Sequence, residues 1–245
     1  MSRPVLLIAG GSRGIGAATA KLAGARGYDV AVNYKTNSNA AAAVVKAVEK
    51  GGGKAVAIQG DMAIENDIER VFDTAGETFG SLTHFVHSSG IIGDNSRLDD
   101  ANSATIREVL DIDTFGALWC LRACIRRMST KHGGKGGAVV MLSSMAAPLG
   151  GANECVWYAA AKAGVDSMVI GASREVAKEG MRINAVTPGV IDTDIQPPGR
   201  IERVTPMLPM GRAGQAEEVA EAVLFLLSDA ASNINGANLR VSGGR

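Results

Sequence analysis

A tyrosine and a lysine four residues apart form the most reactive pairing in this sequence. Tyr158-Ala-Ala-Ala-Lys162 lies in a stretch with helical periodicity, so the phenol and the ammonium share one helix face. A free tyrosine has a pKa of about 10, and a neighbouring positive charge stabilises its phenolate. Lys162 can therefore prepare Tyr158 to act as a general acid or base near neutral pH. An exposed Tyr/Lys pair on a surface helix has the same spacing, so the meaning of this motif depends on the rest of the chain.

A glycine-rich turn near the start of the chain is the second chemical motif. Gly10-Gly-Ser-Arg-Gly-Ile-Gly16 follows the apolar run Val5–Ala9 and opens a helical stretch. Glycines at such a turn let a phosphate approach backbone amides at the positive end of a helix, which predicts a dinucleotide diphosphate as ligand. A P-loop would need Lys and Ser or Thr where Ala17 and Ala18 stand, and too few residues precede Gly10 for a hydrolase elbow. A glycine turn without a ligand is the remaining alternative.

The charge pattern after the second apolar run bears on the choice of cofactor. NAD-selective sites usually carry a carboxylate about 20 residues beyond the glycines, where it binds the adenosine 2′-hydroxyl. No carboxylate occurs between Asp29 and Glu49, and the run ends with Asn33-Tyr34-Lys35. A 2′-phosphate would meet no repulsion there, and Arg13 and Lys35 could neutralise it. The pattern favours NADP(H) over NAD(H), the alternative being that both cations are solvated surface groups.

The segments that must position these residues alternate between short apolar runs and longer amphipathic stretches. Several of the short runs are almost wholly apolar, which is typical of parallel strands buried on both faces. The predicted strands, about seven, are Val5–Ala9, Val30–Tyr34, Ala55–Gln59, Leu82–His87, Ala138–Ser143, Arg182–Thr187 and Ala237–Val241. The predicted helices are Ala17–Arg26, Ala40–Lys50, Glu65–Phe79, Thr105–Met128, Ala159–Glu179 and Glu217–Leu227. This alternation predicts an α/β fold with a doubly wound parallel sheet and helices on both faces, in one domain over residues 1–245.

One long segment, Ile195–Gly211, lacks clear periodicity. Its four prolines make a single regular element unfavourable. Such a loop near the carboxyl edge of the sheet is suited to cover a substrate as a lid.

Composition excludes several classes of partner. The 245-residue chain carries 25 basic and 25 acidic side chains and no Lys/Arg-rich block, so nucleic-acid binding has no electrostatic source. The apolar run Val5–Ala9 is too short for a signal sequence or a membrane span, which predicts a cytoplasmic protein with no membrane partner. Cys120, Cys124 and Cys155 lack metal-ligand spacing, so we expect neither a disulfide nor a metal site.

Taken together, these motifs resemble the short-chain dehydrogenase/reductase family over essentially the whole chain. The glycine turn matches the family's GxxxGxG pattern at Gly10, Gly14 and Gly16, and Ser144 precedes Tyr158 at about the spacing of the family's catalytic serine. The further matches are Asp61-Met62, Pro188–Thr193, Pro209–Arg212 and Val241–Gly244. The sequence is similar to 3-oxoacyl-(acyl-carrier-protein) reductases and to glucose dehydrogenase-like members. The resemblance implies a three-layer, Rossmann-like fold.

The resemblance also implies roles for individual residues. Tyr158 would exchange a proton with the substrate oxygen, Ser144 would polarise the carbonyl, and Lys162 would lower the tyrosine pKa and hold the nicotinamide ribose. Ser143 is a rival for Ser144, but its side chain should point to the opposite face because it is the adjacent strand residue. The implied cofactor-binding residues are Gly10, Ser12, Arg13, Gly14, Ile15, Gly16, Asn33, Tyr34, Lys35, Asp61, Met62, Ser89, Gly90, Tyr158, Lys162, Pro188, Gly189, Ile191 and Thr193.

Three positions depart from the family pattern. Asp113 stands where an asparagine commonly completes the proton relay, and its backbone carbonyl could still hold the relay water. Its carboxylate near Lys162 would offset part of the positive charge, so we expect an active enzyme with a shifted pH optimum. His87-Ser-Ser-Gly90 replaces the usual Asn-Asn-Ala-Gly run, and Ala9 replaces a threonine. We expect His87 and His84 to be structural, because Tyr158 already supplies the acid/base function.

The predicted function is an NADP(H)-dependent carbonyl reductase or alcohol dehydrogenase acting on a small molecule. A 3-oxoacyl-(acyl-carrier-protein) reductase is the alternative within the same class. A catalytically weak NADP(H)-binding sensor or subunit is the alternative outside it, motivated by Asp113 and opposed by the joint presence of Ser144, Tyr158 and Lys162. The family resemblance further implies a homotetramer built through Thr105–Met128 and Ala159–Glu179.

Overall fold

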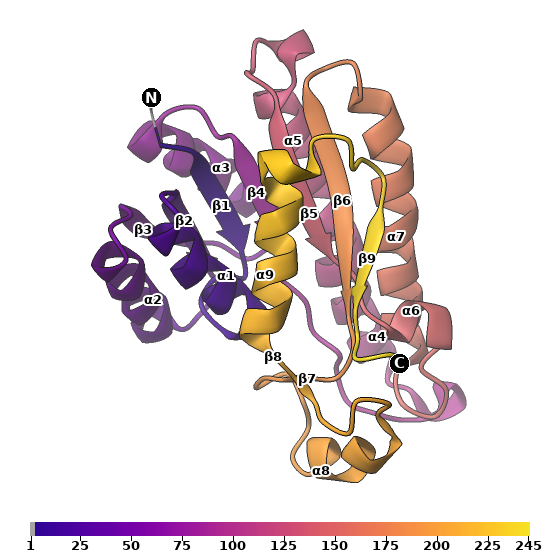
Figure 1. Ribbon diagram of the computed structural model, residues 1–245. Helices are drawn as coiled ribbons and strands as arrows, with labels where there is room; N and C mark the ends of the chain where they lie inside the picture. The colour runs from indigo at the N-terminus through magenta and orange to yellow at the C-terminus, as the bar shows by residue number, and fades with distance from the viewer. Residues whose placement is uncertain (1–2) are drawn as a thin grey trace.

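Seven parallel strands form the central sheet of the protein. The computed structural model describes residues 3–245, and Figure 1 shows the sheet between two layers of helices. The strand order is β3-β2-β1-β4-β5-β6-β9. The strands are β1 (Val5–Ala9), β2 (Asp29–Tyr34), β3 (Ala55–Gln59), β4 (His84–His87), β5 (Gly137–Leu142), β6 (Met181–Pro188) and β9 (Asn238–Val241). The predicted doubly wound α/β fold is confirmed.

The central strands are apolar because the sheet buries both of its faces. All five residues of β1 are buried. Leu7 and Ala9 belong to one core cluster, while Leu6 and Ile8 belong to another. Successive side chains of a strand point to opposite faces, so the unbroken apolar run supplies both cores at once.

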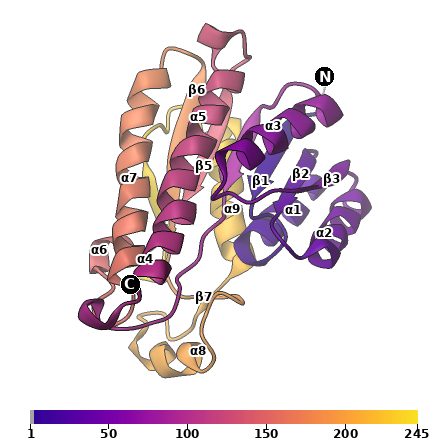
Figure 2. The same cartoon turned by 180° about the vertical axis from the view of Figure 1, so that it is seen from behind.

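Three major helices cover each face of the sheet. One face carries α1 (Gly14–Ala25), α2 (Ser38–Lys50) and α9 (Ala216–Leu227), in front in Figure 1. The other carries α3 (Glu65–Phe79), α5 (Ala117–Met128) and α7 (Val156–Val176), in front in Figure 2. The shorter elements are α4 (Ser103–Leu110), α6 (Ala146–Leu149), α8 (Arg200–Val204) and the 3₁₀ turns Leu98–Asp100, Thr130–His132, Thr205–Met207 and Asp229–Ala231.

The chain is helical over the whole of the predicted helix Thr105–Met128, but a π-helical turn divides that helix in two. The helix α4 ends at Leu110, a π-helical turn spans Asp111–Gly116, and α5 continues from there. A π-helical turn inserts an extra residue into the helix and is frequent at functional sites. A Cβ at Gly116 would lie 2.1 Å from the carbonyl oxygen of Met62, so glycine permits this close approach. The turn carries Asp113 into the interior, where its side chain is fully buried.

The strand order places a crevice between β1 and β4. Chain connections run outward in opposite directions from β1 and β4, and ligands of doubly wound folds bind at the carboxyl ends of strands where the order reverses. The glycine turn follows β1, and Ser88–Gly90 follow β4. Ser143 and Ser144 follow β5, and Gly189 follows β6. Apart from the helical Asp113, Tyr158 and Lys162, the predicted site residues therefore lie in loops and at element ends along one edge of the sheet.

The predicted lid segment, Ile195–Gly211, forms a compact region below this edge of the sheet (Figure 1). It contains α8 and the 3₁₀ turn Thr205–Met207, and the two-stranded ribbon of β7 (Ile191–Asp192) and β8 (Gly214–Gln215) joins its two ends. The prediction that it is not one regular element is confirmed. Among residues 3–245, no helix combines the length and apolar character that crossing a membrane requires.

Candidate active site

Two adjoining cavities open at the carboxyl edge of the sheet. The first, here called the dinucleotide cleft, has a volume of about 410 Å³. The second, here called the catalytic pocket, has a volume of about 160 Å³. The two share walls made by Ile15, Thr193 and the Ser88–Gly90 loop. They therefore form a continuous site in which a long ligand in the cleft can reach a small molecule in the pocket.

The predicted residues gather around these cavities. The cleft is lined by Gly10, Ser12, Arg13, Gly14, Ile15, Asn33, Tyr34, Lys35, Asp61, Met62, Ser89, Gly90 and Thr193. The pocket is lined by Ile15, Ser89, Gly90, Ser144, Tyr158, Lys162, Pro188, Gly189, Ile191 and Thr193. Two predicted residues, Gly16 and Asp113, line neither cavity. Gly16 instead permits the turn to close, and Asp113 lies behind Lys162.

Glycine is required in the first turn because backbone atoms approach it closely. A Cβ at Gly16 would lie 2.3 Å from the carbonyl oxygen of Gly10, and one at Gly10 would lie 2.8 Å from the amide nitrogen of Ser89. Gly10 also has a φ of +72°, which favours glycine. The turn is thus a cradle without side chains, of the kind that a diphosphate needs in order to reach backbone amides at the start of α1. These residues fit a dinucleotide cofactor.

Asn33 holds the turn in place from the neighbouring strand. Its side-chain oxygen accepts a hydrogen bond from the Gly10 amide at 3.1 Å, and its side-chain nitrogen donates to the Gly60 carbonyl at 3.0 Å. The side chain is buried. Although Asn33 borders the cleft, its polar atoms join β2 to the loops after β1 and β3 rather than facing a ligand.

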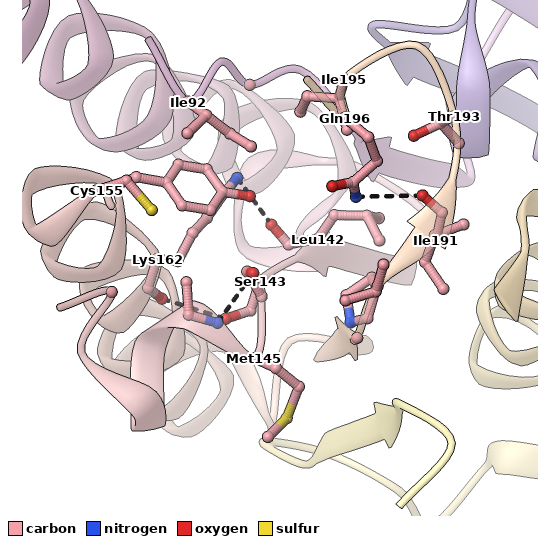
Figure 3. Close-up of a pocket in the computed structure, with 18 of the residues that line it drawn as sticks. Ile92, Leu142, Ser143, Met145, Cys155, Lys162, Ile191, Thr193, Ile195 and Gln196 are labelled. Carbon is pink, nitrogen blue, oxygen red and sulfur yellow. Dashed lines mark hydrogen bonds between the residues drawn. The ribbon is translucent and has the colours of Figure 1, made fainter. Parts of the chain in front are cut away.

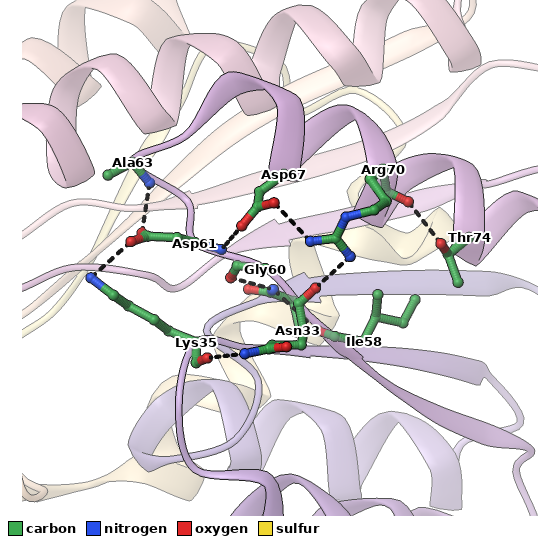
Figure 4. Close-up of polar contacts among 10 residues, drawn as sticks. Asn33, Lys35, Ile58, Gly60, Asp61, Ala63, Asp67, Arg70 and Thr74 are labelled. Carbon is green, nitrogen blue, oxygen red and sulfur yellow. Dashed lines mark hydrogen bonds and ion pairs between the residues drawn. The ribbon is translucent and has the colours of Figure 1, made fainter.

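The two cations predicted for a 2′-phosphate each have a carboxylate partner. The Lys35 ammonium lies 2.8 Å from Asp61, as Figure 4 shows. The Arg13 guanidinium lies 2.9 Å from Asp194. Both Arg13 and Asp194 are largely exposed, and exposed ion pairs contribute little to stability. A phosphate could replace Asp194 at low cost, so both cations remain suited to an anionic ligand.

Tyr158 and Lys162 meet as the helical spacing predicts. The Lys162 ammonium lies 5.6 Å from the centre of the Tyr158 ring, and both side chains are buried. Lys162 also donates a hydrogen bond to the Leu142 carbonyl at 3.2 Å (Figure 3). The pKa of Tyr158 is raised above its ordinary value, chiefly by burial, while the charge of Lys162 and a hydrogen bond with Ser144 oppose the rise. The free enzyme therefore holds the phenol protonated, with two neighbours that stabilise the phenolate when it forms.

Asp113 adds a negative charge to the same cluster. Its Oδ1 accepts a hydrogen bond from the Ile91 amide at 3.0 Å, and its Oδ2 lies 3.4 Å from the Lys162 ammonium. Burial raises the pKa of Asp113, and Lys162 opposes this rise. Burial alone would lower the pKa of Lys162, but the charges of Asp113 and Tyr158 raise it. Lys162 is therefore held as an ammonium.

Comparison with known proteins identifies the family. A family model described as enoyl-(acyl carrier protein) reductase matches residues 9–245. The uncharacterized oxidoreductase YgfF of Escherichia coli K12 is 41% identical over 98% of this chain and 99% of its own length. A 3-oxoacyl-(acyl-carrier-protein) reductase of Synechocystis is 34% identical over 100% of this chain and 97% of that enzyme. The chain belongs to the short-chain dehydrogenase/reductase family.

A solved structure extends this similarity to three dimensions. The crystal structure of a short chain dehydrogenase from Burkholderia cenocepacia J2315 in complex with NADP has a TM-score of 0.91 at 33% identity, covering 99% of this chain and 97% of that chain. Short-chain dehydrogenases/reductases are oxidoreductases that act on alcohol or carbonyl groups and bind a nicotinamide cofactor. The cradle at Gly10–Gly16 is consistent with that class of ligand.

In this short-chain dehydrogenase/reductase, the two serines after β5 have different surroundings. The Ser143 hydroxyl is buried and donates to the Lys162 carbonyl at 3.2 Å. Ser144 interacts with the Tyr158 hydroxyl, and its Oγ accepts a hydrogen bond from the Ala146 amide at 3.1 Å. The geometry favours Ser144 as the serine that can share a substrate oxygen with Tyr158.

The two histidines of β4 line neither cavity, His87 being fully buried and His84 half-buried. Burial lowers the pKa of His87 to about 3, with a further contribution from the charge of Lys162. Neither ring nitrogen of His87 has a hydrogen-bond partner among the described residues. Burial likewise lowers the pKa of His84 to about 4, and its Nδ1 lies 2.8 Å from the Thr83 hydroxyl. Both histidines are held neutral, which suits packing better than acid/base chemistry.

Several residues around the cavities were missed by the sequence analysis. Those of the catalytic pocket include Ile92, Leu142, Met145, Leu149, Glu154, Cys155, Val190, Ile195, Gln196, Arg200 and Arg245. Figure 3 shows several of these, with Gln196 donating to the Ile191 carbonyl at 3.2 Å. The lid prediction named the segment that supplies Ile195, Gln196 and Arg200. No motif marked the individual side chains, because a loop without periodicity does not indicate which residues face inward.

Proposed function

We propose that this protein is an NADP(H)-dependent oxidoreductase that interconverts a small carbonyl compound and its secondary alcohol, with Tyr158 as the general acid and base. The observation that carries the proposal is the joining of two cavities. Tyr158 and Ser144 line the catalytic pocket, and the pocket adjoins the cleft at the glycine turn. A carbonyl bound against the phenol would face the ring of a nicotinamide lying across the shared wall.

The side chains can divide the work of such a reaction. The bound nicotinamide would supply or accept the hydride, since that chemistry belongs to the cofactor. Ser144 would hydrogen-bond the substrate oxygen, and Tyr158 would donate a proton to it in reduction or remove one in oxidation. Lys162 would stabilise the phenolate by its charge. The Leu142 carbonyl orients the Lys162 ammonium at 3.2 Å.

The preference for NADP(H) rests on charge near the open end of the cleft. Arg13 and Lys35 both line it. Their carboxylate partners, Asp194 and Asp61, come from other loops, and each pair is solvent-accessible. A 2′-phosphate is the stronger partner, because it carries more charge and more acceptor oxygens than a carboxylate. The NADP complex of the Burkholderia relative is consistent with this preference.

A reductase of 3-oxoacyl groups on acyl carrier protein is the second candidate. The 34% identity to the Synechocystis enzyme over the whole chain favours it. Both candidates require the same proton transfer from Tyr158 and differ only in substrate. An acetoacetyl thioester in the substrate panel separates them.

The homotetramer implied by the family is also proposed for this chain. Phe115 in the π-helical turn, Leu118 at the start of α5 and Ile170 on α7 leave large apolar side chains exposed on the same side of the sheet. Covering such side chains is a common reason for association. Light scattering coupled to size exclusion would give a tetrameric mass, and L118E together with I170E would lower it. A monomer for the wild type at micromolar concentration would contradict the proposal.

The decisive experiment follows NADPH oxidation with diketones, aldehydes, quinones and acetoacetyl thioesters. We expect turnover of at least one carbonyl, and a loss of about 10²–10⁴-fold in Y158F with NADPH binding retained. Y28F is the matched control, since Tyr28 packs against His84 away from both cavities and should keep wild-type activity. NADPH binding without turnover of any carbonyl would support a sensor or subunit instead.

A further inference from the structure

The lid contributes a positively charged side chain to the catalytic pocket. Arg200 is the first residue of α8, and it lines the pocket together with Tyr158 and Ser144. Its side chain is only 11% exposed. A guanidinium cannot lose its charge on burial, so it must find acceptors. The partners that Arg200 has and lacks therefore indicate which class of ligand the pocket can bind.

Arg200 has fewer partners than its burial demands. One nitrogen, Nη2, donates to Glu154 Oε2 at 2.8 Å. The Nε atom is buried and has no partner among the residues that the structure describes. The second oxygen of Glu154 is 3.5 Å from Arg203, so Glu154 divides its charge between two cations. Leaving a buried donor unpaired is unfavourable, and such exceptions in native structures call for an explanation.

The charge balance of the pocket is positive on the lid side. Its charged lining residues are Glu154, Lys162, Arg200 and Arg245. The ammonium of Lys162 is offset by Asp113 behind it. This leaves the single carboxylate of Glu154 to pair with both guanidinium groups of α8, those of Arg200 and Arg203. An acidic ligand would neutralise the excess positive charge in the pocket, whereas a cationic ligand would increase it.

We propose that Arg200 binds a carboxylate of the substrate, so that the enzyme acts on small hydroxy acids and oxo acids. This inference rests on the proposed function, because it concerns the far end of a molecule whose carbonyl faces Tyr158. A guanidinium presents parallel N–H groups that match the two oxygens of a carboxylate. The pocket volume of about 160 Å³ is close to the space that holds one benzene-sized ring, which limits the substrate to a small body between its two polar ends.

The competing explanation is that Arg200 only fastens the lid. Its ion pair with Glu154 joins α8 to the loop before α7, and a purely structural fastener would affect all substrates equally. Arg203 provides the matched control. It contacts the same carboxylate from the next turn of α8 but is mostly exposed and lies outside the pocket. Comparing R200M with R203M therefore separates substrate binding from lid fastening.

The first test compares an oxo acid with its neutral ester in NADPH-dependent reduction. The probes are 4-oxocyclohexanecarboxylate and its methyl ester, measured with wild type, R200M, R200K and R203M. We expect the ratio of kcat/KM for the acid to that for the ester to fall about 10–100-fold in R200M, less in R200K, and little in R203M. An unchanged ratio in R200M, or an equal fall in R203M, would overturn the proposal.

A second test needs no turnover. Calorimetry on the NADPH complex compares cyclohexanecarboxylate with cyclohexanecarboxamide, which have the same ring but differ in charge. We expect the wild type and R203M to prefer the acid and R200M to lose that preference, while equal or undetectable binding of both ligands to the wild type would refute the proposal. Failure of the underlying function has a different signature, namely no reduction of any carbonyl and no effect of Y158F.

Discussion

The carboxylate of Asp113 lies 3.4 Å from the ammonium of Lys162, and the Asp113 side chain is fully buried. The sequence predicts that a carboxylate here offsets the charge that Lys162 presents to Tyr158. The electrostatics of the site agree, because burial and the charge of Asp113 raise the pKa of Tyr158 while the charge of Lys162 lowers it. The pKa of the proposed acid/base residue thus depends on burial and on two opposite charges.

Removing the charge of Asp113 should shift the pH dependence of catalysis. In D113N the amide oxygen can still accept from Ile91, but the negative charge that raises the pKa of Tyr158 is lost. The pKa of Tyr158 should fall. Alcohol oxidation requires the phenolate, so its acidic limb should move to lower pH, and the alkaline limb of carbonyl reduction should move the same way. Profiles of kcat/KM in both directions measure this shift.

The neighbouring Asp111 supplies the control for that experiment. It belongs to the same π-helical turn but is not among the groups that influence Tyr158 or Lys162. D111N should keep the wild-type profile. A profile in D113N that coincides with the wild type, or that moves to higher pH, would contradict the assigned direction.

Arg13 should carry part of the preference for NADPH. The guanidinium lines the dinucleotide cleft, and its partner Asp194 is 52% exposed. If Arg13 binds the 2′-phosphate, R13A should raise KM for NADPH about 10-fold and change KM for NADH much less, since NADH lacks that phosphate. Steady-state kinetics with both cofactors at one ionic strength make the comparison.

Substituting Asp194, the carboxylate partner of Arg13, should change KM for NADPH in the opposite direction. The Asp194 carboxylate lies 2.9 Å from the Arg13 guanidinium, so it competes with a 2′-phosphate for that group. D194N should therefore lower KM for NADPH by a few-fold, a modest change because exposed ion pairs are weak. Equal effects of either substitution on NADPH and NADH would place Arg13 outside the 2′-phosphate site.

The fold, and the grouping of the proposed catalytic residues around one pocket, could be predicted because their signals are local. Apolar runs such as Val5–Ala9 indicate strands buried on both faces, and the spacing of Tyr158 and Lys162 indicates a shared helix face. The choice between Ser143 and Ser144 also followed from a local rule, the alternation of side chains along a strand. Each of these inferences needs only neighbouring residues.

Other features depend on contacts between distant segments and left no local signal. The π-helical turn at Asp111–Gly116 is accommodated where Gly116 packs against the Met62 carbonyl, a contact that helical periodicity does not reveal. The ion pair of Lys35 with Asp61 and the entry of Arg200 into the pocket likewise depend on how loops meet. The lid was predicted as a segment, but the side chains that face inward can be identified only from the path of the folded chain.

Replacing glycine by alanine should have opposite effects in the crowded first turn and on a helix with free space around the residue. A Cβ at Gly16 would lie 2.3 Å from the Gly10 carbonyl, whereas one at Gly76 in α3 would have nothing within 4 Å. G16A should cost about 1–3 kcal/mol through overpacking and weaken NADPH binding. G76A should stabilise the protein by about 0.5–1 kcal/mol, because alanine is the better helix former. Denaturant unfolding with and without NADPH tests both, and a neutral G16A would show that the turn relaxes.

Acid should destabilise the fold through His87. Its pKa is lowered by burial to about 3, while an unfolded histidine titrates near about 6.5. Between these values the unfolded chain binds a proton that the folded chain does not, so stability is full above pH 6.5 and falls as the pH decreases.

H87N removes the titrating group and gives the measurement. The wild type should lose about 1.4 kcal/mol per pH unit below pH 6.5 from His87, and H87N should show a correspondingly shallower slope. Urea unfolding from pH 5 to pH 8 at one protein concentration yields both slopes. Identical slopes in the wild type and H87N would mean that His87 takes up its proton at the same pH in the folded and the unfolded chain, which would contradict the lowered pKa of the buried ring.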